Sequence, residues 1–382
     1  MSRGVVCGRR TAGVVWGEGM DRMGNREQNS NEKRAWLAPA LFVLVLLASF
    51  VLMNVLPDGE VPAFLSDATA GLLGGSAGLL DGAGLDGGAL GDLVAVVWQI
   101  LREGALAAVA VVAVAVAVPS ALYWGLRGKR APGLRLGPGF VVAMLAVGLL
   151  GGAFSASAAM NGGEFSACAA ISGGESFNYM QTLLRGFGFA AAALIQVALG
   201  GPNVWFIVLL LAVLALLTGL FEEAFIRVLG TETVVGGLWA RGVEKRRAVL
   251  LAAVVTSAIF ALLHVGVPAE GSGVAGWLQM AGRFLQTGLF GFCMAGLYEQ
   301  SKSLWPCALL HAGFNLLYLN IFPFVPGMAP AYGSGAPSVS VLLIITTICL
   351  IPLAVKAYRV MANLPIAPDE LEFEAGTEGM AA

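Results

Sequence analysis

The stretch Phe221-Glu222-Glu223-Ala224-Phe225-Ile226-Arg227 decides how this chain is interpreted. It follows an apolar run from Val204 to Leu220 that predicts a membrane-spanning helix, which we expect to extend to Leu229. A charge costs about 2.5–3.5 kcal/mol near the centre of a membrane and less near the interface, so charged side chains there need partners. We therefore take this stretch as a candidate functional site.

Helix geometry gives the two glutamates different roles. Glu223 and Arg227 are four residues apart and share a face, with the acid on the N-terminal side, which favours an ion pair. Glu222 lies about 100° further round the helix and is not part of that pair. We expect Glu223 to be structural and Glu222 to be available for chemistry.

The composition is that of a membrane protein. The 382 residues are 58% hydrophobic and 12% charged, with a mean hydropathy of +0.81, whereas soluble domains carry about 25% charged residues. The predicted fold class is all-α: a polytopic membrane helix bundle of about eight transmembrane helices, with a polar catalytic cavity between helices. The net charge of −2 and the lack of a basic face exclude nucleic acid as an expected partner.

The chain divides into four expected regions: a disordered basic N-terminus at 1–34, N-terminal transmembrane helices with a Gly-rich acidic loop at 35–180, a membrane core at 181–360 and an acidic tail at 361–382. The predicted spans are 35–56, 104–126, 139–159, 204–229, 248–264, 277–298, 305–322 and 339–355; whether the short segment 186–199 also crosses is left open. Loop 57–92 is acidic and loop 241–247 is basic, so the N-terminus is expected to be cytoplasmic. The Ala/Gly-rich composition indicates a bacterial plasma membrane.

Two further pairs of residues complete the candidate site. Phe260 and His264 are four residues apart on one apolar helix, and His311 and Asn315 are four apart on another, so each pair shares a face. His264 and His311 are the two histidines of the chain. A buried polar side chain is costly without a partner. We expect Glu222, His264, His311 and Asn315 to converge in a polar cavity.

This set of side chains is suited to hydrolysis, with or without a metal. A glutamate paired with a histidine can take a proton from water, and a second histidine and an amide can stabilise an oxyanion. Alternatively, Glu222, His264 and His311 would bind Zn²⁺, since two histidines and a glutamate form a known catalytic ligand set. A zinc site would use one glutamate as ligand and the other as base, and the ion pair expected for Glu223 favours metal-free chemistry. Both cofactor hypotheses, none or Zn²⁺, stay open at this point.

Taken together, the motifs resemble the signature of the CAAX prenyl endopeptidase and bacteriocin-processing family, the type II CAAX proteases. The resemblance covers about residues 186–322. The three motifs are Glu222-Glu223-x-x-x-Arg227, Phe260-x-x-x-His264 and His311-x-x-x-Asn315.

The resemblance implies an intramembrane endopeptidase in which Glu222 and His264 activate water. It implies that His311 and Asn315 stabilise the oxyanion. The supporting motif residues are Glu223, Arg227 and Phe260. The family has been described both as metalloproteases and as glutamate-dependent enzymes, so the resemblance implies no single cofactor.

The expected partners are the lipid bilayer and a membrane peptide or lipidated protein as substrate. A non-catalytic membrane scaffold, an immunity factor or a proton-coupled transporter is the alternative. A transporter usually shows two related halves, and no such symmetry is evident in the sequence. Gln279, Arg283 and Gln286 lie at helical spacing, but we expect Arg283 to extend to the membrane interface, and we leave all three out of the site.

Overall fold

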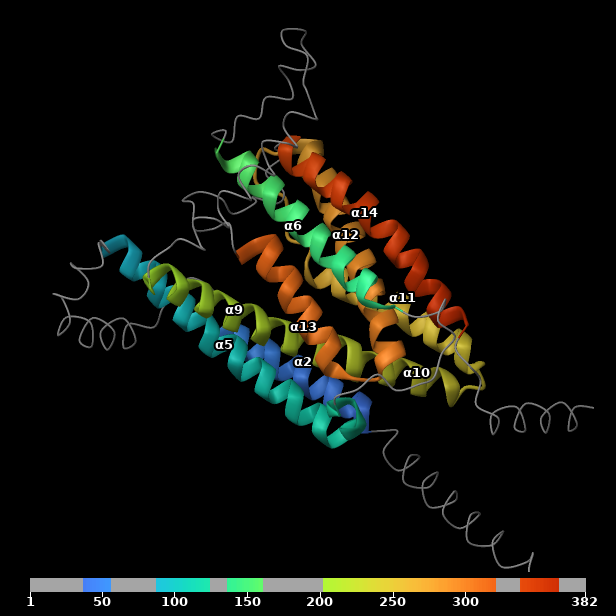
Figure 1. The fold of residues 1–382 in the computed structure, drawn as a ribbon. Helices are drawn as coiled ribbons and strands as arrows, with labels where there is room; N and C mark the ends of the chain where they lie inside the picture. The colour runs from blue at the N-terminus through green and yellow to red at the C-terminus, as the bar shows by residue number, and fades with distance from the viewer. Residues whose placement is uncertain (1–36, 56–86, 124–135, 161–201, 321–336, 364–382) are drawn as a thin grey trace, which may run out of the picture.

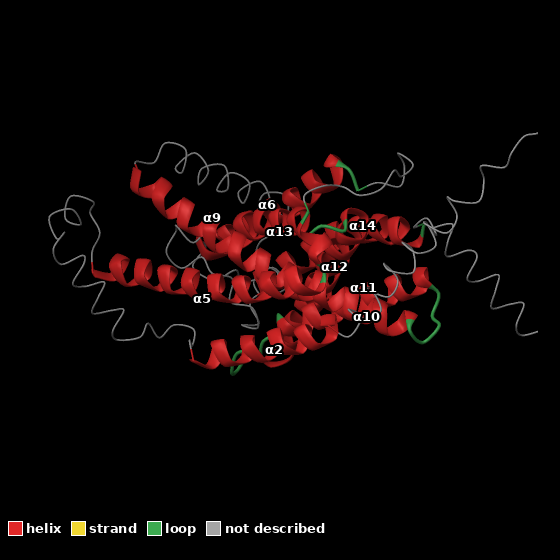
Figure 2. Ribbon diagram, turned by 90° about the horizontal axis from the view of Figure 1, so that it is seen from below, coloured by secondary structure: helices red, strands yellow, loops and turns green. Residues whose placement is uncertain are grey.

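The computed structural model describes residues 37–55, 87–123, 136–160, 202–320 and 337–363 (Figure 1). Within these ranges every regular element is helical, which confirms the predicted all-α class (Figure 2). Apolar segments in a bilayer must satisfy their own backbone hydrogen bonds, and a helix does so within one segment. The predictions for 1–34, for 186–199 and for most of the acidic tail concern residues outside the described ranges.

The helices follow one another in a simple order. They are α2 (Leu37–Val55), α5 (Gly87–Ala117), the 3₁₀-helix η1 (Pro119–Leu122), α6 (Pro138–Met160), α9 (Pro202–Glu222), the π-helix η3 (Glu223–Gly230), α10 (Thr231–Trp239), α11 (Lys245–Leu263), α12 (Gly273–Ser301), α13 (Leu304–Asn315), the π-helix η4 (Leu316–Asn320) and α14 (Pro337–Ala362).

Helix α13 lies in the middle of the bundle (Figure 1). On one side of it, α9 packs against α5, and α5 packs against α2. On the other side, α6 and α12 both pack against α14, and α11 packs against α12. Because α13 contacts α9, α6 and α12, a residue on α13 can meet side chains from both halves of the bundle.

Four helical segments in the described ranges are long and apolar enough to cross a membrane: Val96–Ala117, Val208–Trp239, Lys245–Leu263 and Val339–Ala362. Leu37–Val51 and Pro138–Gly152 are shorter apolar helices. The structure therefore supports an integral membrane protein without confirming the count of eight spans. Helix α12 is 29 residues long, but Gln279, Arg283 and Gln286 lower its hydropathy. Apolar side chains such as Leu44, Leu209, Val254 and Ile348 are exposed, as expected for surfaces that face lipid.

Helix α5 differs from the predicted span at both ends. We expected it to start at Gly104, after the charged Arg102 and Glu103, but it starts at Gly87. The two charged side chains lie inside the helix and pair with each other, at 3.2 Å between Arg102 Nη2 and Glu103 Oε1. The helix ends at Ala117 and not at Leu126, since Pro119 begins a separate 3₁₀ turn there.

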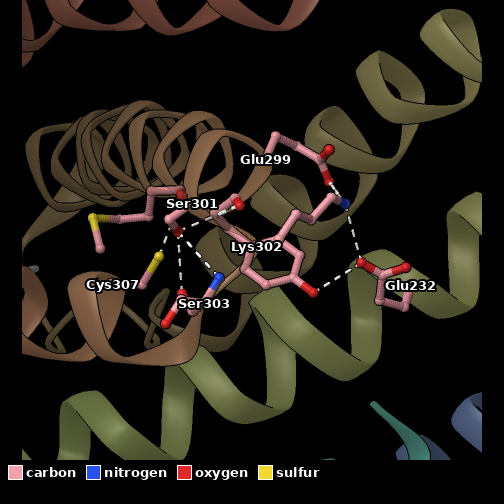
Figure 3. A network of polar contacts seen from close by, with 8 residues as sticks. Glu232, Glu299, Ser301, Lys302, Ser303 and Cys307 are labelled. Carbon is pink, nitrogen blue, oxygen red and sulfur yellow. Dashed lines mark hydrogen bonds and ion pairs between the residues drawn. The ribbon is translucent and has the colours of Figure 1, made fainter. Parts of the chain in front are cut away.

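An ion cluster ties α10 to the end of α12 (Figure 3). Lys302 Nζ lies 3.1 Å from Glu232 Oε1 and 2.9 Å from Glu299 Oε1. Tyr298 donates its hydroxyl to the same Glu232 oxygen at 2.8 Å. Burial lowers the pKa of Lys302, but the two carboxylates outweigh this effect and raise its pKa above the ordinary 10.5. The lysine therefore stays charged at neutral pH, and the stability that its raised pKa contributes is lost as the pH rises above 10.5 and through the raised value.

Replacing Lys302 with Met is expected to destabilise the protein. Glu299, whose side chain is 1% exposed, would lose the cation that compensates its burial. Breaking a fully buried pair costs about 3–5 kcal/mol; because Lys302 is 40% exposed, we expect about 1–3 kcal/mol. Thermal unfolding in detergent measures this, with the exposed Lys356 of α14 as the matched control. An equal decrease in unfolding temperature for Lys302→Met and Lys356→Met would contradict a stabilising role of the ion cluster between α10 and α12.

Candidate functional site

The two glutamates lie where the helix changes type. Glu222 is the last residue of α9, and Glu223 is the first residue of η3, whose eight residues are all buried. The sequence predicted one regular α-helix up to Leu229, whereas the structure inserts a π-helix and continues as α10 to Trp239. π-Helices are rare and occur frequently at functional sites.

Glu222 lies between the two histidines of the chain. Its Oε1 is 3.6 Å from His264 Nε2, and its Oε2 is 3.3 Å from His311 Nε2. The side chain of Glu222 is 19% exposed and that of His264 is 26% exposed, whereas His311 is 3% exposed. One carboxylate thus joins α9, α11 and α13, and the cluster is accessible from the His264 side.

The other nitrogen of each imidazole is engaged as well. His264 Nδ1 lies 2.8 Å from the carbonyl oxygen of Phe260, four residues earlier in the same helix. A carbonyl oxygen can only accept, so Nδ1 carries a proton, and Nε2 is the ring nitrogen that faces Glu222. His311 Nδ1 lies 2.8 Å from Glu223 Oε1. Both rings are therefore oriented with Nε2 towards Glu222.

Glu223 has the structural position expected for it. The predicted ion pair is present, with Arg227 Nε 3.4 Å from Glu223 Oε2 and both side chains fully buried. The guanidinium carbon lies 4.7 Å from the centroid of the Phe260 ring, and Gly291 leaves room for it, since a Cβ there would lie 2.8 Å from Arg227 Nη2. Glu223 thereby links Arg227 to His311.

Aromatic rings surround the histidines. The Phe260 ring lies 4.3 Å from the His264 ring and 5.9 Å from the His311 ring, centroid to centroid. Phe290 of α12 lies 4.9 Å from His311 in an edge-on arrangement. These contacts restrict both imidazoles to one orientation and keep the surroundings of the carboxylates apolar.

Asn315 is the candidate residue that the structure does not join to the others. It is the last residue of α13, about one helical turn beyond His311, and is half-buried. Its side chain makes no hydrogen bond with the part of the chain that the structure describes. Glu222, His264 and His311 are in contact, whereas the convergence of Asn315 with them stays a prediction.

Two charged residues near the site were missed by the sequence reasoning. Arg283, which was left out of the predicted site, donates its Nε–H to the backbone oxygen of His264 at 2.9 Å. Glu103 of α5 lies close enough to Glu222 for the two carboxylates to repel each other. Both are charged residues within apolar helices, and that is the signal by which they could have been found.

The fit of a zinc ion is incomplete. The donor types are suitable, and both Nδ1 atoms are engaged in the manner that orients metal-binding histidines. However, the two Nε2 atoms face different oxygens of Glu222, and Glu223 is engaged by Arg227 and His311. In the described ranges no three His, Cys, Asp or Glu side chains are arranged to hold a metal ion. We therefore derive no chemical step through a metal.

A comparison with protein families agrees with this geometry. The model of the family described as type II CAAX prenyl endopeptidase, Rce1-like, matches residues 203–317. This segment runs from α9 into η4 and contains all three motifs, so the resemblance predicted from them is confirmed. Neither a curated protein nor a solved structure matches the chain significantly.

The close approach of α9 to α13 generates a prediction. A Cβ at Gly219 would lie 2.8 Å from the Ala308 oxygen and 3.1 Å from the Ala312 nitrogen, both of which are backbone atoms. Gly219→Ala should therefore push α13, with His311, away from α9, at about 1–3 kcal/mol for overpacking.

The matched control for this substitution is Gly288→Ala. The new Cβ there would lie 3.7 Å from Ala261 Cβ, an ordinary contact. Thermal unfolding in detergent should show a loss of stability for Gly219→Ala and none for Gly288→Ala. Equal stabilities would mean that α9 and α13 are not in close contact at Gly219.

Proposed function

We propose that this protein is an intramembrane endopeptidase that hydrolyses peptide bonds of membrane-associated or lipidated peptides. The observation that carries the proposal is the Glu222 carboxylate between the Nε2 atoms of His264 and His311, at 3.6 and 3.3 Å. The family match over residues 203–317 supports the same class of activity.

In the proposed reaction Glu222 and His264 activate a water molecule. The water donates hydrogen bonds to the carboxylate and to Nε2 of His264, whose Nδ1 is engaged by the Phe260 carbonyl. As its oxygen attacks the substrate carbonyl, one proton passes to this pair. The same proton is returned to the amine nitrogen when the C–N bond breaks. Such general acid–base catalysis contributes about 10²- to 10⁴-fold to the rate.

His311 and Asn315 are proposed to stabilise the oxyanion. With both ring nitrogens protonated, His311 keeps its Nδ1–H on Glu223 and offers its Nε2–H to the developing charge. The Asn315 amide supplies a second donor from the end of the same helix. Preorganised donors of this kind are each worth about 10²- to 10³-fold in rate. Glu223 and Arg227 hold His311 in place.

The membrane setting restricts the substrate. Glu222 lies within the membrane-spanning segment Val208–Trp239, so a peptide must reach it between helices, which favours substrates already held in the bilayer. We propose that α2, α6, α12 and α13 also cross, giving about eight spans with a cytoplasmic N-terminus in a bacterial plasma membrane. We also propose that the water is activated without a metal.

The test is cleavage of a fluorogenic panel by purified protein in detergent. The panel contains prenylated CAAX-type peptides, leader peptides and membrane peptides. We expect turnover that falls by about 10²-fold or more in Glu222→Gln and in His264→Ala, because each removes a proton acceptor. The control is Glu270→Gln, an exposed acid in the loop after α11, which should retain wild-type activity.

Metal removal is the second arm of this test. We expect elemental analysis to find no stoichiometric zinc and cleavage to survive a chelator. Chelator-sensitive cleavage with one zinc per chain would contradict the metal-free mechanism while leaving the peptidase intact. Cleavage unchanged in Glu222→Gln, or a cellular phenotype that survives Glu222→Gln without cleavage of any panel member, would contradict the peptidase and favour the scaffold.

The oxyanion role of Asn315 gives a separate prediction. Asn315→Ala should lower kcat by about 10²- to 10³-fold with little change in KM, because the lost hydrogen bond forms only in the transition state. Steady-state kinetics on the best panel substrate measure this split. A raised KM with unchanged kcat would show that Asn315 binds the substrate instead.

A further inference from the structure

Arg283 is a charged residue of α12 that none of the three motifs contains. Its Nε donates to the backbone oxygen of His264 at 2.9 Å, across nineteen residues of sequence. Arg283 is half-buried, and charged residues within the helices of a membrane protein are rare without a role. The contact is made to the main chain of the residue whose ring faces Glu222.

The position of His264 explains why its backbone needs support. Helix α11 ends at Leu263, and His264 is its C-cap. The last carbonyl groups of a helix have no partner within it, and a cation near that end is favourable. Residues 265–272 after the cap are not helical. Arg283 thus gives the end of α11 a hydrogen bond from another helix, α12.

Helix α12 is itself held in place by hydrogen bonds to neighbouring helices. Gln279 donates to Ser340 Oγ at 3.1 Å, and Gln286 donates to Tyr318 Oη at 2.9 Å and to Thr346 Oγ1. Both glutamines are buried, and their bonds join α12 to α14 and η4. Arg283 lies between them in sequence. Because α12 is held by these bonds, the hydrogen bond from Arg283 also restricts the position of the end of α11.

We propose that Arg283 is a positioning residue for His264: its hydrogen bond to the His264 carbonyl fixes the α11 C-terminus and thereby the distance from His264 Nε2 to Glu222. The predicted effect of Arg283 on catalysis rests on the proposed function. The hydrogen bond itself does not depend on that function. The two can therefore be tested separately.

The structural test uses ¹⁵N-histidine NMR on the full chain in detergent micelles. The chain has two histidines, so their ring nitrogens give separate, assignable signals that report tautomer and hydrogen bonding. In Arg283→Met we expect the His264 signals to shift or split while those of His311 keep their positions. Arg283→Lys, which keeps a cationic donor, should restore them in part.

The matched control is Gln279→Met, on the same helix one turn earlier. It removes the hydrogen bond from Gln279 to Ser340 of α14 and leaves the bond from Arg283 to His264 in place, so both histidines should keep their signals. Unchanged His264 signals in Arg283→Met, or the same shift in Gln279→Met, would overturn the proposal. If Arg283→Met does not fold, Arg283→Gln takes its place with the same expectations.

The kinetic test applies if the protein cleaves a panel peptide. Arg283→Met should lower kcat by about 10- to 100-fold, as expected for a misplaced catalytic group, with KM changed by less than about twofold. Arg283→Lys should recover part of kcat. A KM effect alone would mean that Arg283 binds substrate. Cleavage of no peptide by wild type would count against the proposed function, whereas the NMR outcome would still decide the role of Arg283.

Discussion

The structure depends on one constraint: a carboxylate inside a membrane protein needs partners. Glu222 satisfies it with two imidazoles, from α11 and α13, and Glu223 satisfies it with Arg227 and His311. Because the partners come from different helices, the same contacts hold α9, α11 and α13 in one arrangement. A set of groups suited to moving protons is thus also a part of what holds the bundle together.

The local sequence patterns predicted the site well where only helix geometry was needed. Residues four apart share a face, so the Glu223–Arg227 pair and the Phe260–His264 contact followed directly from spacing. The meeting of Glu222 with both histidines followed from the cost of leaving them unpaired. The assignment of catalytic roles to these residues stays a prediction, as does the role of Asn315, whose position beyond His311 gives it no partner in the described part of the chain.

The features that the sequence did not predict depend on tertiary contacts, which a local sequence pattern does not contain. The π-helix at Glu223–Gly230 replaces an α-helix that the apolar run predicted equally well, and tertiary packing selects between them. Helix α5 starts seventeen residues before Gly104 and includes the paired Arg102 and Glu103, a pairing that hydropathy does not register. Arg283 was left out of the predicted site, since its spacing alone could not reveal that the end of α11 lies within its reach.

The central claim is that one carboxylate, Glu222, lies between both imidazoles, and the histidine signals in ¹⁵N NMR test it most directly. Replacing Glu222 with Gln should shift the Nε2 signals of His264 and His311 together, because both atoms face it. Replacing Glu223 with Gln should shift the Nδ1 signal of His311 and leave the Nδ1 signal of His264 in place. If Glu222→Gln moves the signals of one histidine alone, or of neither, Glu222 does not lie between both imidazoles.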